Sequence, residues 1–517
     1  MRKLGLRDQQ KQIELNDVES LLTPARTDHL KEGSMPMTIF GTAPPLAGLG
    51  RKAQAWLAVI FAALASPSAR ADDWTVQTRS LYERMINTDT TADHAQNTIR
   101  LIGTIADDFI RASFPKAGIN ILPYDQTAAL IVRWSAVHAK ARPILLLAHL
   151  DVVAAQPEEW THAPFHLEEH DGYYYGRGTL DDKQGATALV MALLELHAEG
   201  FHPTRDLILL LTGDEESEEH GAELAATSWR QWTDAEFALN ADAGGGRFNL
   251  AGDAIGFTFQ AAEKTYATFS VTARNRGGHS SKPRPDNAIY DLAASLTRLA
   301  NYRFEPLLNE TTRAYFTARQ KSEPNALGDA MRRWLADDTD GAAADAIEAD
   351  ENEIGMTRTR CVATRIQGGH ADNALAQKAS ATVNCRIMPG VTVESAGLEL
   401  VKIVGNPALE VKVAYAETPG PASPLRKDVL AAYSAAVHRH FPDAPIIPEM
   451  STVGTESRQF RIAGIPAYGV DGSWIVVPQD QRMHGQDERL PVKALFDDVQ
   501  HWHDMIAALA GVSTAPR

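Results

Sequence analysis

Residues 143–151 read PILLLAHLD, an unbroken apolar run that ends in a histidine and a carboxylate. A second apolar run, Arg205–Thr212, follows it, and the stretch between them at Gly185–Leu196 has a helical pattern. Strands that are apolar along their whole length are buried on both faces, as in parallel sheets that carry helices on each side. We therefore predict an α/β domain with a mostly parallel central sheet flanked by helices.

Acidic and histidine residues stand near the ends of the predicted strands. Ligands of α/β sheets bind outside the carboxyl ends of the strands, so we expect these side chains to meet at one edge of the sheet. Their nitrogen and oxygen atoms suffice for two metal ions and one spare carboxylate, which is the inventory of a two-metal hydrolase. The segments are His149–Asp151, Asp181–Lys183, Asp214–Glu216, Asp242 and His484.

Each of these segments also has an ordinary structural explanation when it is taken alone. His149 and Asp151 could form a turn with a salt bridge, and one aspartate of the Asp181-Asp182 pair could cap the following helix. The acidic residues at 214–216 could form a solvated loop, and a lone loop histidine such as His484 carries little information. Adjacent carboxylates at a strand end nevertheless repel each other unless a cation or a proton separates them, so the joint pattern favours chemistry.

The character of the chain changes near Thr265, where β-branched and aromatic residues begin to alternate as in a half-buried strand. Further helical and strand-like runs continue to Ala414 and form a β-α-β-β-α-β-like set. We predict that this α+β, ferredoxin-like unit is a lid or dimerisation domain inserted into the catalytic domain. A charged, alanine-rich stretch at Arg303–Arg358 is expected to be helical and to elaborate this lid. The predicted bounds are 1–71 for an N-terminal extension with a signal peptide, 72–264 and 418–517 for the two parts of the catalytic domain, and 265–417 for the lid.

The N-terminal region has the features of an export signal. Arg51 and Lys52 precede the apolar run Ala53–Ala65, which is too short to span a bilayer comfortably. Ala69-Arg70-Ala71 then matches a signal-peptidase cleavage site. We expect a signal peptide over roughly residues 35–71 and an exported, periplasmic mature protein, with an uncleaved membrane anchor as the alternative.

Composition and charge limit the partners. The 517-residue chain has a net charge of −16, and such an acidic surface repels phosphate backbones, so we expect no nucleic acid partner. We also expect no stable membrane partner. The two cysteines, Cys361 and Cys385, lack the spacing of a metal site, so a metal would be bound by histidines and carboxylates. After export these cysteines could form a disulfide, but the sequence does not show whether they meet.

The order and spacing of the motifs resemble the superfamily of zinc carboxypeptidases, aminoacylases and desuccinylases. The resemblance extends over roughly Thr75–Leu509. The segments GRGTLDDK (176–183) and GDEES (213–217) are most similar to the branch that contains carboxypeptidase S and the secreted N-acyl-amino-acid hydrolases. The resemblance implies two Zn²⁺ ions per chain, with other divalent metals as alternatives.

The resemblance also implies which residues bind the metals. The five implied ligands are His149 and Asp242 for the first site, His484 and Glu216 for the second, and Asp181 as the bridge between the ions. The neighbouring Asp182 is expected to cap the helix or to face solvent instead.

Further roles follow from the same resemblance. Asp151 would orient the first-site histidine, and Glu215 would be the general base that deprotonates the attacking water and passes the proton to the leaving amine. In the lid, His279 would polarise the carbonyl oxygen of the substrate. Asn373 and Arg386 would hold the substrate's free carboxylate, a task that suits a forked guanidinium. We expect the lid to close over the cleft, because these residues lie far in sequence from the metal ligands.

These features predict a di-zinc metallohydrolase of the carboxypeptidase or dipeptidase type. It would cleave a peptide or N-acyl amide bond next to a residue with a free carboxylate. Two departures leave the specificity open: Asp242 stands where many carboxypeptidases and desuccinylases have glutamate, and Thr455-Glu456-Ser457 stands where Thr-Asp-Gly is more usual. The alternatives are an N-acyl-amino-acid deacylase, an aminopeptidase-like dipeptidase and, more remotely, a peptide-binding protein without catalysis.

The expected partner is therefore a small peptide or an N-acyl amino acid, bound as substrate. A second copy of the chain is the other candidate, because dimeric relatives pair through the lid. Some monomeric relatives carry enlarged lids, so the stretch Arg303–Arg358 leaves both a homodimer and a monomer open.

Overall fold

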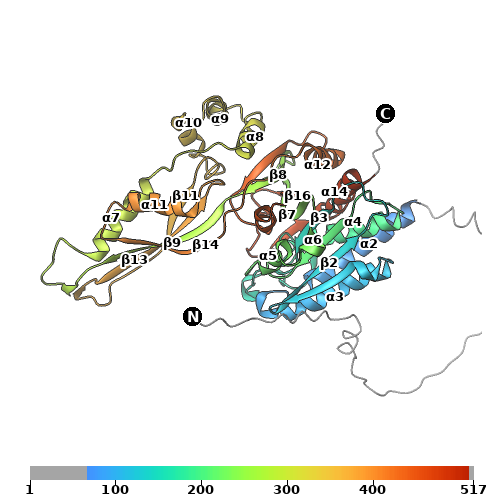
Figure 1. Ribbon diagram of the computed structural model, residues 1–517, viewed down its shortest axis with the longest axis horizontal. Helices are drawn as coiled ribbons and strands as arrows, with labels where there is room; N and C mark the ends of the chain where they lie inside the picture. The colour runs from blue at the N-terminus through green and yellow to red at the C-terminus, as the bar shows by residue number, and fades with distance from the viewer. Residues whose placement is uncertain (1–66, 512–517) are drawn as a thin grey trace, which may run out of the picture. The chain divides into compact units, whose positions relative to one another are not determined.

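The computed structural model describes residues 67–511, and its largest sheet has eight strands. They are β1 (Ile119–Tyr124), β2 (Thr127–Trp134), β3 (Ile144–His149), β6 (Leu207–Thr212), β7 (Phe237–Phe248), β8 (Ala254–Glu263), β15 (Ile446–Ser451) and β16 (Ala467–Val476). Their order is β1-β2-β6-β3-β7-β16-β8-β15. Figure 1 labels β2, β3, β7, β8 and β16 of this sheet. The four central strands, β6, β3, β7 and β16, run parallel, whereas antiparallel pairs lie toward both edges.

Helices cover both faces of this sheet. They are α2 (Pro67–Ile86), α3 (Ala95–Arg111), α4 (Lys183–Ala198), α5 (His220–Ala226), α6 (Arg230–Thr233), α12 (Lys427–His440), α13 (Ser457–Ile462) and α14 (Val492–Ala510). On one face, alternate strand residues such as Leu145 and Leu147 share a core with α5, α6 and α13. On the other face, α3, α4 and α14 contact β2, β3 and β16 respectively. The predicted α/β fold with a mostly parallel central sheet flanked by helices is confirmed.

A second, antiparallel sheet of four strands follows β8 in the chain. Its strands are β9 (Thr265–Arg274), β11 (Arg360–Gly368), β13 (Lys378–Ile387) and β14 (Glu410–Ala416), and its helices are α7 (Ala288–Asn301) and α11 (Val393–Val404). The strand order is β11-β13-β9-β14. Alternate residues of β9, such as Phe269 and Val271, are buried in a core with both helices, so one face is covered. This is the α+β unit expected as a lid, although its exact bounds stay a prediction.

The two cysteines lie opposite each other on neighbouring strands of the lid sheet. Cys361 on β11 pairs in register with Cys385 on β13, and a disulfide joins them. The pairing that the sequence left open is therefore present in the structure.

The alanine-rich stretch between the first lid helix and β11 is helical, as expected, but it packs elsewhere. It contains α8 (Glu310–Arg319), α9 (Ala326–Ala336) and α10 (Gly341–Ile347). Their apolar side chains, including Phe316 and Trp334, form a core that also takes in Ile447 of β15. Helix α8 thus contacts the edge strand of the large sheet, and the expectation that this stretch elaborates the lid is corrected. The apolar faces of these short helices are buried against a strand edge that would otherwise lack a neighbour.

Several short elements complete the described chain. They are β4 (Glu168–His170), β5 (Tyr173–Tyr175) and β17 (Arg489–Pro491) in one small sheet, β10 (Gly278–His279) with β12 (Ala374–Leu375), and 3-10 turns at Ala92–His94, Lys116–Gly118 and Pro157–Glu159.

The predicted signal peptide falls almost wholly outside the described residues, because residues 1–66 are not described. Among residues 67–511, no helix is long and apolar enough to cross a membrane. Export and cleavage therefore stay predictions.

Candidate metal centre and active site

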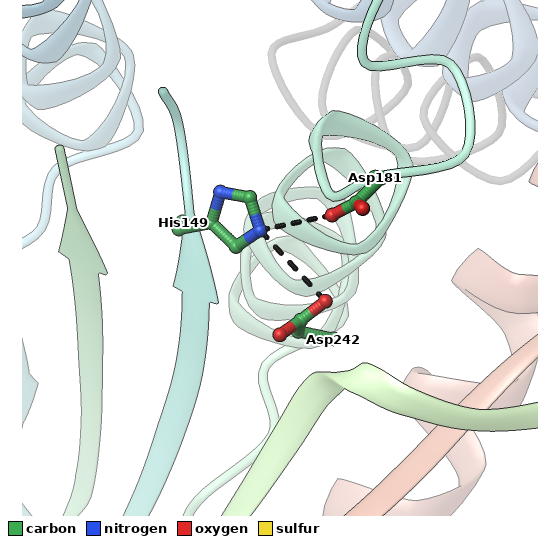
Figure 2. A group of neighbouring side chains, drawn as sticks. All are labelled: His149, Asp181 and Asp242. Atoms are coloured by element: carbon green, nitrogen blue, oxygen red, sulfur yellow. Dashed lines mark hydrogen bonds and ion pairs between the residues drawn. The ribbon is translucent and has the colours of Figure 1, made fainter. Parts of the chain in front are cut away.

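The first cluster of metal-type residues lies at the edge of the large sheet where β3 ends. His149 is the last residue of β3, Asp181 lies in the loop before α4, and Asp242 lies on β7 (Figure 2). The Nε2 atom of His149 lies 3.1 Å from Asp181 Oδ1 and 3.7 Å from Asp242 Oδ1. One atom from each residue lies within 4.8 Å of the others, which is close enough to hold a metal ion. The first-site residues implied by the sequence therefore meet, although β7 continues to Phe248 and Asp242 does not end it.

The second cluster shares Asp181 with the first. His484 Nε2 lies 3.1 Å from Asp181 Oδ2 and 3.0 Å from Glu216 Oε1. The two carboxylate oxygens of Asp181 thus face two different histidines, His149 and His484. This is the arrangement expected of a carboxylate that bridges two cations. The five predicted ligands are brought together, and their metal binding itself stays a prediction.

Asp151 and Glu215 lie beside the first cluster. The carboxylate of Asp151 accepts hydrogen bonds from the backbone N–H groups of Glu215, at 3.0 Å, and of Glu216, at 2.9 Å. Its Oδ1 atom is also 3.6 Å from Nδ1 of His149. Asp151 therefore does more than orient the histidine, because it also fixes the acidic loop. Glu215 Oε2 lies 4.0 Å from His149 Nε2, and Glu215 forms a further group of potential ligands with His149 and Glu216.

The electrostatics of the centre show an excess of negative charge. Burial raises the pKa of Glu215 well above its ordinary value, and burial raises the pKa of Asp242 to about 7. Hydrogen bonds to Asp181 and Glu216 raise the pKa of His484 to about 10. Without a cation, these groups share protons to limit their mutual repulsion.

His149 shows the same effect. Burial disfavours its charged form, but the carboxylates of Asp151, Asp181 and Asp242 outweigh burial and raise its pKa well above the ordinary value. Histidine nitrogens and carboxylate oxygens in this number suit a pair of divalent cations, which would take the place of the shared protons. The donor set therefore fits two metal ions.

A cavity of about 430 Å³ opens onto both clusters. Its lining includes Asp181, Glu215 and His484, together with Gly244–Gly246 and Trp474. A cavity of this size takes a small molecule rather than a folded protein.

The prediction for Asp182 is wrong. It occupies the N-cap position of α4, but its side chain makes no capping hydrogen bond and is fully buried. Its Oδ2 atom accepts from the backbone N–H of His149 at 3.3 Å, so the carboxylate turns inward behind the first cluster. Gly185 is consistent with this inward position, because a Cβ at residue 185 would collide with Asp182 Oδ1.

Arg386 lies close to the cavity. It pairs in register with Tyr266, near the start of β9, and its guanidinium lies 4.7 Å from the centre of that ring. Arg386 Nη1 donates to the carbonyl oxygen of Thr452 at 3.3 Å, and the neighbours Ser451 and Val453 line the cavity. Arg386, the residue that the resemblance implies for carboxylate binding, thus lies next to the segment that lines the cavity.

His279 and Asn373 lie together but not at this cavity. Ser280 donates its backbone N–H to the carbonyl oxygen of Asn373, and His279 is exposed. His279 follows β9 and Asn373 precedes β13, so both lie next to the end of the lid sheet at which Arg274 pairs with Lys378. A ten-residue strand such as β9 is roughly 30 Å long. This end of the sheet is therefore remote from the start of β9, where Tyr266 pairs with Arg386. Strand length is the physical reason that His279 does not reach the centre of its own chain here.

Fold and site together are those of a metal-dependent hydrolase. The chain belongs to peptidase family M20/M25/M40, whose model matches residues 145–508. This confirms the family inferred from the sequence, and the relatives are peptidases and aminoacylases that act on amide bonds.

Two relatives illustrate the likeness in sequence. The chain is 30% identical over 376 residues to the human N-fatty-acyl-amino acid synthase/hydrolase PM20D1, covering 71% of this chain and 74% of that protein. It is 25% identical over 421 residues to "Probable carboxypeptidase S-like 2" of Dictyostelium discoideum, covering 77% of this chain and 78% of that protein.

Solved structures share the fold. The M20 family metallo-carboxypeptidase Sso-CP2 of Sulfolobus solfataricus matches with a TM-score of 0.60 at 16% identity, over 83% of this chain and 98% of that one. The YXEP protein of Bacillus subtilis, described as a dinuclear metal binding peptidase from the M20 family, matches with a TM-score of 0.54 at 12% identity, over 85% of this chain and 99% of that one.

Proposed function

We propose that the protein is an exported di-zinc hydrolase that cleaves a peptide or N-acyl amide bond next to a residue with a free carboxylate. The position of Asp181 carries this proposal, because its two oxygens face His149 and His484 while Glu215 is buried beside them. A bridging carboxylate next to an unused acid is what a two-metal hydrolase needs.

The residues divide between two metal sites. His149 and Asp242 would hold one zinc, His484 and Glu216 would hold the other, and Asp181 would bind both. The donor set supports this division, as does the fold shared with a peptidase described as dinuclear. Bound zinc would activate water and stabilise the negative charge that develops on the carbonyl oxygen.

Glu215 would handle the proton. Its carboxylate lies within reach of the centre, and its buried position favours holding a proton between two steps. It would take the proton from the attacking water and give it to the nitrogen of the leaving amine. Asp151 would keep Glu215 in place, because its carboxylate accepts a hydrogen bond from the backbone N–H of Glu215.

Arg386 would select substrates with a free carboxylate. Tyr266 stacks under its guanidinium, and Thr452 fixes one of its nitrogens beside the cavity. A forked cation held in this way can pair with both oxygens of a carboxylate.

A homodimer would supply the missing lid residues. His279 and Asn373 lie at the lid end remote from their own centre, so a second copy could bring them to the first copy's cavity. The edge strand β11 supports pairing through the lid, because Val362 and Ile366 on it are exposed. His279 would then polarise the carbonyl oxygen, and Asn373 would contact the substrate.

The class of amide bond is open between a peptide bond and an N-acyl bond. One relative is named a carboxypeptidase and another an N-fatty-acyl-amino acid hydrolase. The test is to assay zinc-loaded protein against matched dipeptides and N-acyl amino acids, each with a free and with an amidated carboxylate. The proposal expects turnover of free-carboxylate substrates only, and it fails if zinc-loaded protein hydrolyses neither class.

Export to the periplasm is part of the proposal. The disulfide between Cys361 and Cys385 supports it, because such bonds persist in oxidising compartments. N-terminal sequencing of protein from the native host should give a mature chain that begins near Asp72. A mature chain that retains Arg51 and Lys52 would favour a membrane anchor instead.

A further inference from the structure

The ligands of the two candidate metal sites come from different kinds of structural element. The first-site residues His149 and Asp242 lie on β3 and β7, which pair with each other in the middle of the large sheet. The second-site residue His484 lies in a loop between β16 and β17, and its side chain is 54% exposed. Its φ of 61° is in the left-handed region, which non-glycine residues adopt only when surrounding contacts hold them there. The second site therefore depends on contacts outside its ligands.

A buried ion pair joins this loop to the loop that carries Asp181. Arg177 lies shortly before Asp181, and Glu488 lies shortly after His484. Arg177 is 2% exposed and Glu488 is fully buried, and the guanidinium of the first contacts the carboxylate of the second. We call this pair the clamp. Neither member lies in a group of potential metal ligands among the described residues.

The carboxylate of the clamp also holds the backbone beside Asp181. Glu488 Oε1 accepts hydrogen bonds from the backbone N–H groups of Gly178, at 3.1 Å, and Leu180, at 2.7 Å. Leu180 is the residue directly before Asp181. The position of the bridging ligand is thus tied to the C-terminal loop.

The guanidinium of the clamp holds the backbone beside His484 in return. Arg177 Nη2 donates to the carbonyl oxygen of Gly485, the residue directly after His484, at 3.0 Å. The ring of Trp160 lies 5.0 Å from the guanidinium carbon and covers it. Each loop therefore carries a charged side chain that binds the backbone of the other loop next to a ligand.

We propose, given the two-metal function above, that Arg177 and Glu488 are positioning residues that control the metal affinity of the second site much more than that of the first. Loss of a residue that orients metal ligands typically costs roughly 10- to 100-fold in metal affinity. Two of the three first-site ligands, His149 and Asp242, lie on central strands of the large sheet, and only Asp181 is shared with the second site. The same loss should therefore change first-site affinity less than about threefold, well below the change at the second site.

The rival explanation is that the clamp only stabilises the fold. Breaking a buried ion pair leaves an unpaired charge and destabilises a protein wherever the pair lies. Glu353 and Arg319 in the helical insertion offer a matched control, because Glu353 is also fully buried and contacts Arg319 at 3.0 Å. Glu353→Gln should lower the melting temperature and leave both metal affinities at wild-type values.

The test is titration of metal-free protein with cobalt(II), followed by absorption and by competition with a chelator. The variants are Glu488→Gln, the double variant Arg177→Met/Glu488→Gln, and the control Glu353→Gln. A His484→Ala protein retains only the first site and assigns the two dissociation constants. Melting temperatures are measured on the same samples.

The clamp is supported if Glu488→Gln weakens the second cobalt ion roughly 10- to 100-fold and the first by less than about threefold. The double variant removes both charges, so it should recover stability but not second-site affinity. Recovery of affinity together with stability, or a second-site constant in Glu488→Gln equal to that of wild type, overturns the inference while the two-metal function stands. A wild type that binds no second ion overturns the proposed function itself.

Discussion

The large sheet and the lid contribute to the candidate site in different ways. On the large sheet and its loops, histidines and carboxylates form groups of three whose ligand atoms already lie within 4.8 Å of one another, such as His149, Asp181 and Asp242. On the lid, Arg386 contacts the segment Ser451–Val453 beside the cavity, whereas His279 lies near the other end of strands that are roughly 30 Å long. The candidate metal centre is therefore assembled within one chain, whereas His279 lies outside it, and in the proposed homodimer a second copy would supply this histidine.

The largest effect on activity is expected from the candidate metal centre on the large sheet. Glu215→Gln should keep both metals and lower kcat by roughly 10²- to 10⁴-fold, because the amide cannot accept the proton from water. Metal analysis and steady-state kinetics on one preparation measure both. Glu218→Gln, an exposed neighbour in the same acidic loop, is the matched control and should keep wild-type activity. Wild-type turnover by metal-loaded Glu215→Gln would remove Glu215 from the mechanism.

The next largest effect on activity is expected from the lid. His279→Ala should lower kcat by roughly 10²- to 10³-fold, as the loss of one donor to a developing oxyanion does. Metal content should not change, because His279 is remote from the ligands.

Mixing two inactive variants distinguishes a shared site from a site closed within one chain. If a second copy supplies His279, an equal mixture of His279→Ala and Glu215→Gln chains regains about a quarter of the wild-type sites after random subunit exchange, because about half of the dimers are heterodimers and each has one intact site. The mixture should therefore be far more active than either variant alone. No recovery after verified subunit exchange would show that each chain uses its own His279.

Arg386 gives a smaller effect at the near end of the lid. It is only partly buried, so Arg386→Ala should cost about 2 kcal/mol in kcat/KM, or roughly thirtyfold, with free-carboxylate substrates. Amidated substrates should lose nothing. Arg360, its neighbour across the strand pair, contacts Glu348 and is the control. Equal losses with free and amidated substrates would mean that Arg386 does not read the carboxylate.

The sequence could predict the large sheet and the metal-type residues at its edge, because the patterns that indicate them are local. Apolar runs such as Ile144–His149 predict buried strands, and residues at their carboxyl ends meet whatever the details of packing. His149 and the acidic loop at 214–216 follow this rule.

The remainder depends on tertiary contacts that no local pattern encodes. Periodicity predicts that α8 has an apolar face, but it does not say that β15 is the partner. Likewise, the distance between Arg386 and His279 depends on the register and length of β9 and β13, not on either motif. Asp182 resembles a helix cap in sequence, and only its burial behind His149 shows otherwise.

The smallest effect expected is on stability, and it also distinguishes the metal centre on the large sheet from the lid. In metal-free protein, burial raises the pKa of Asp242 to about 7 from an ordinary 3.8, so the folded state binds this proton more tightly than the unfolded chain. The linked stability is present at low pH and is lost as the pH rises toward about 7. The pKa of His484, raised to about 10 by Asp181 and Glu216, adds stability that is complete below 6.5 and is lost as the pH rises through about 10.

We therefore expect the melting temperature of metal-free protein to fall between about pH 5 and about pH 9. Zinc should reverse the trend, because its ligands must be deprotonated carboxylates and neutral imidazoles, so its stabilisation grows with pH. Asp242→Asn should flatten the metal-free profile, since an amide does not titrate. His279→Ala should leave the profile as in wild type, because the lid histidine lies outside the centre. Thermal melts with and without chelator measure this, and a metal-free profile that rises with pH would contradict the proton sharing inferred for the centre.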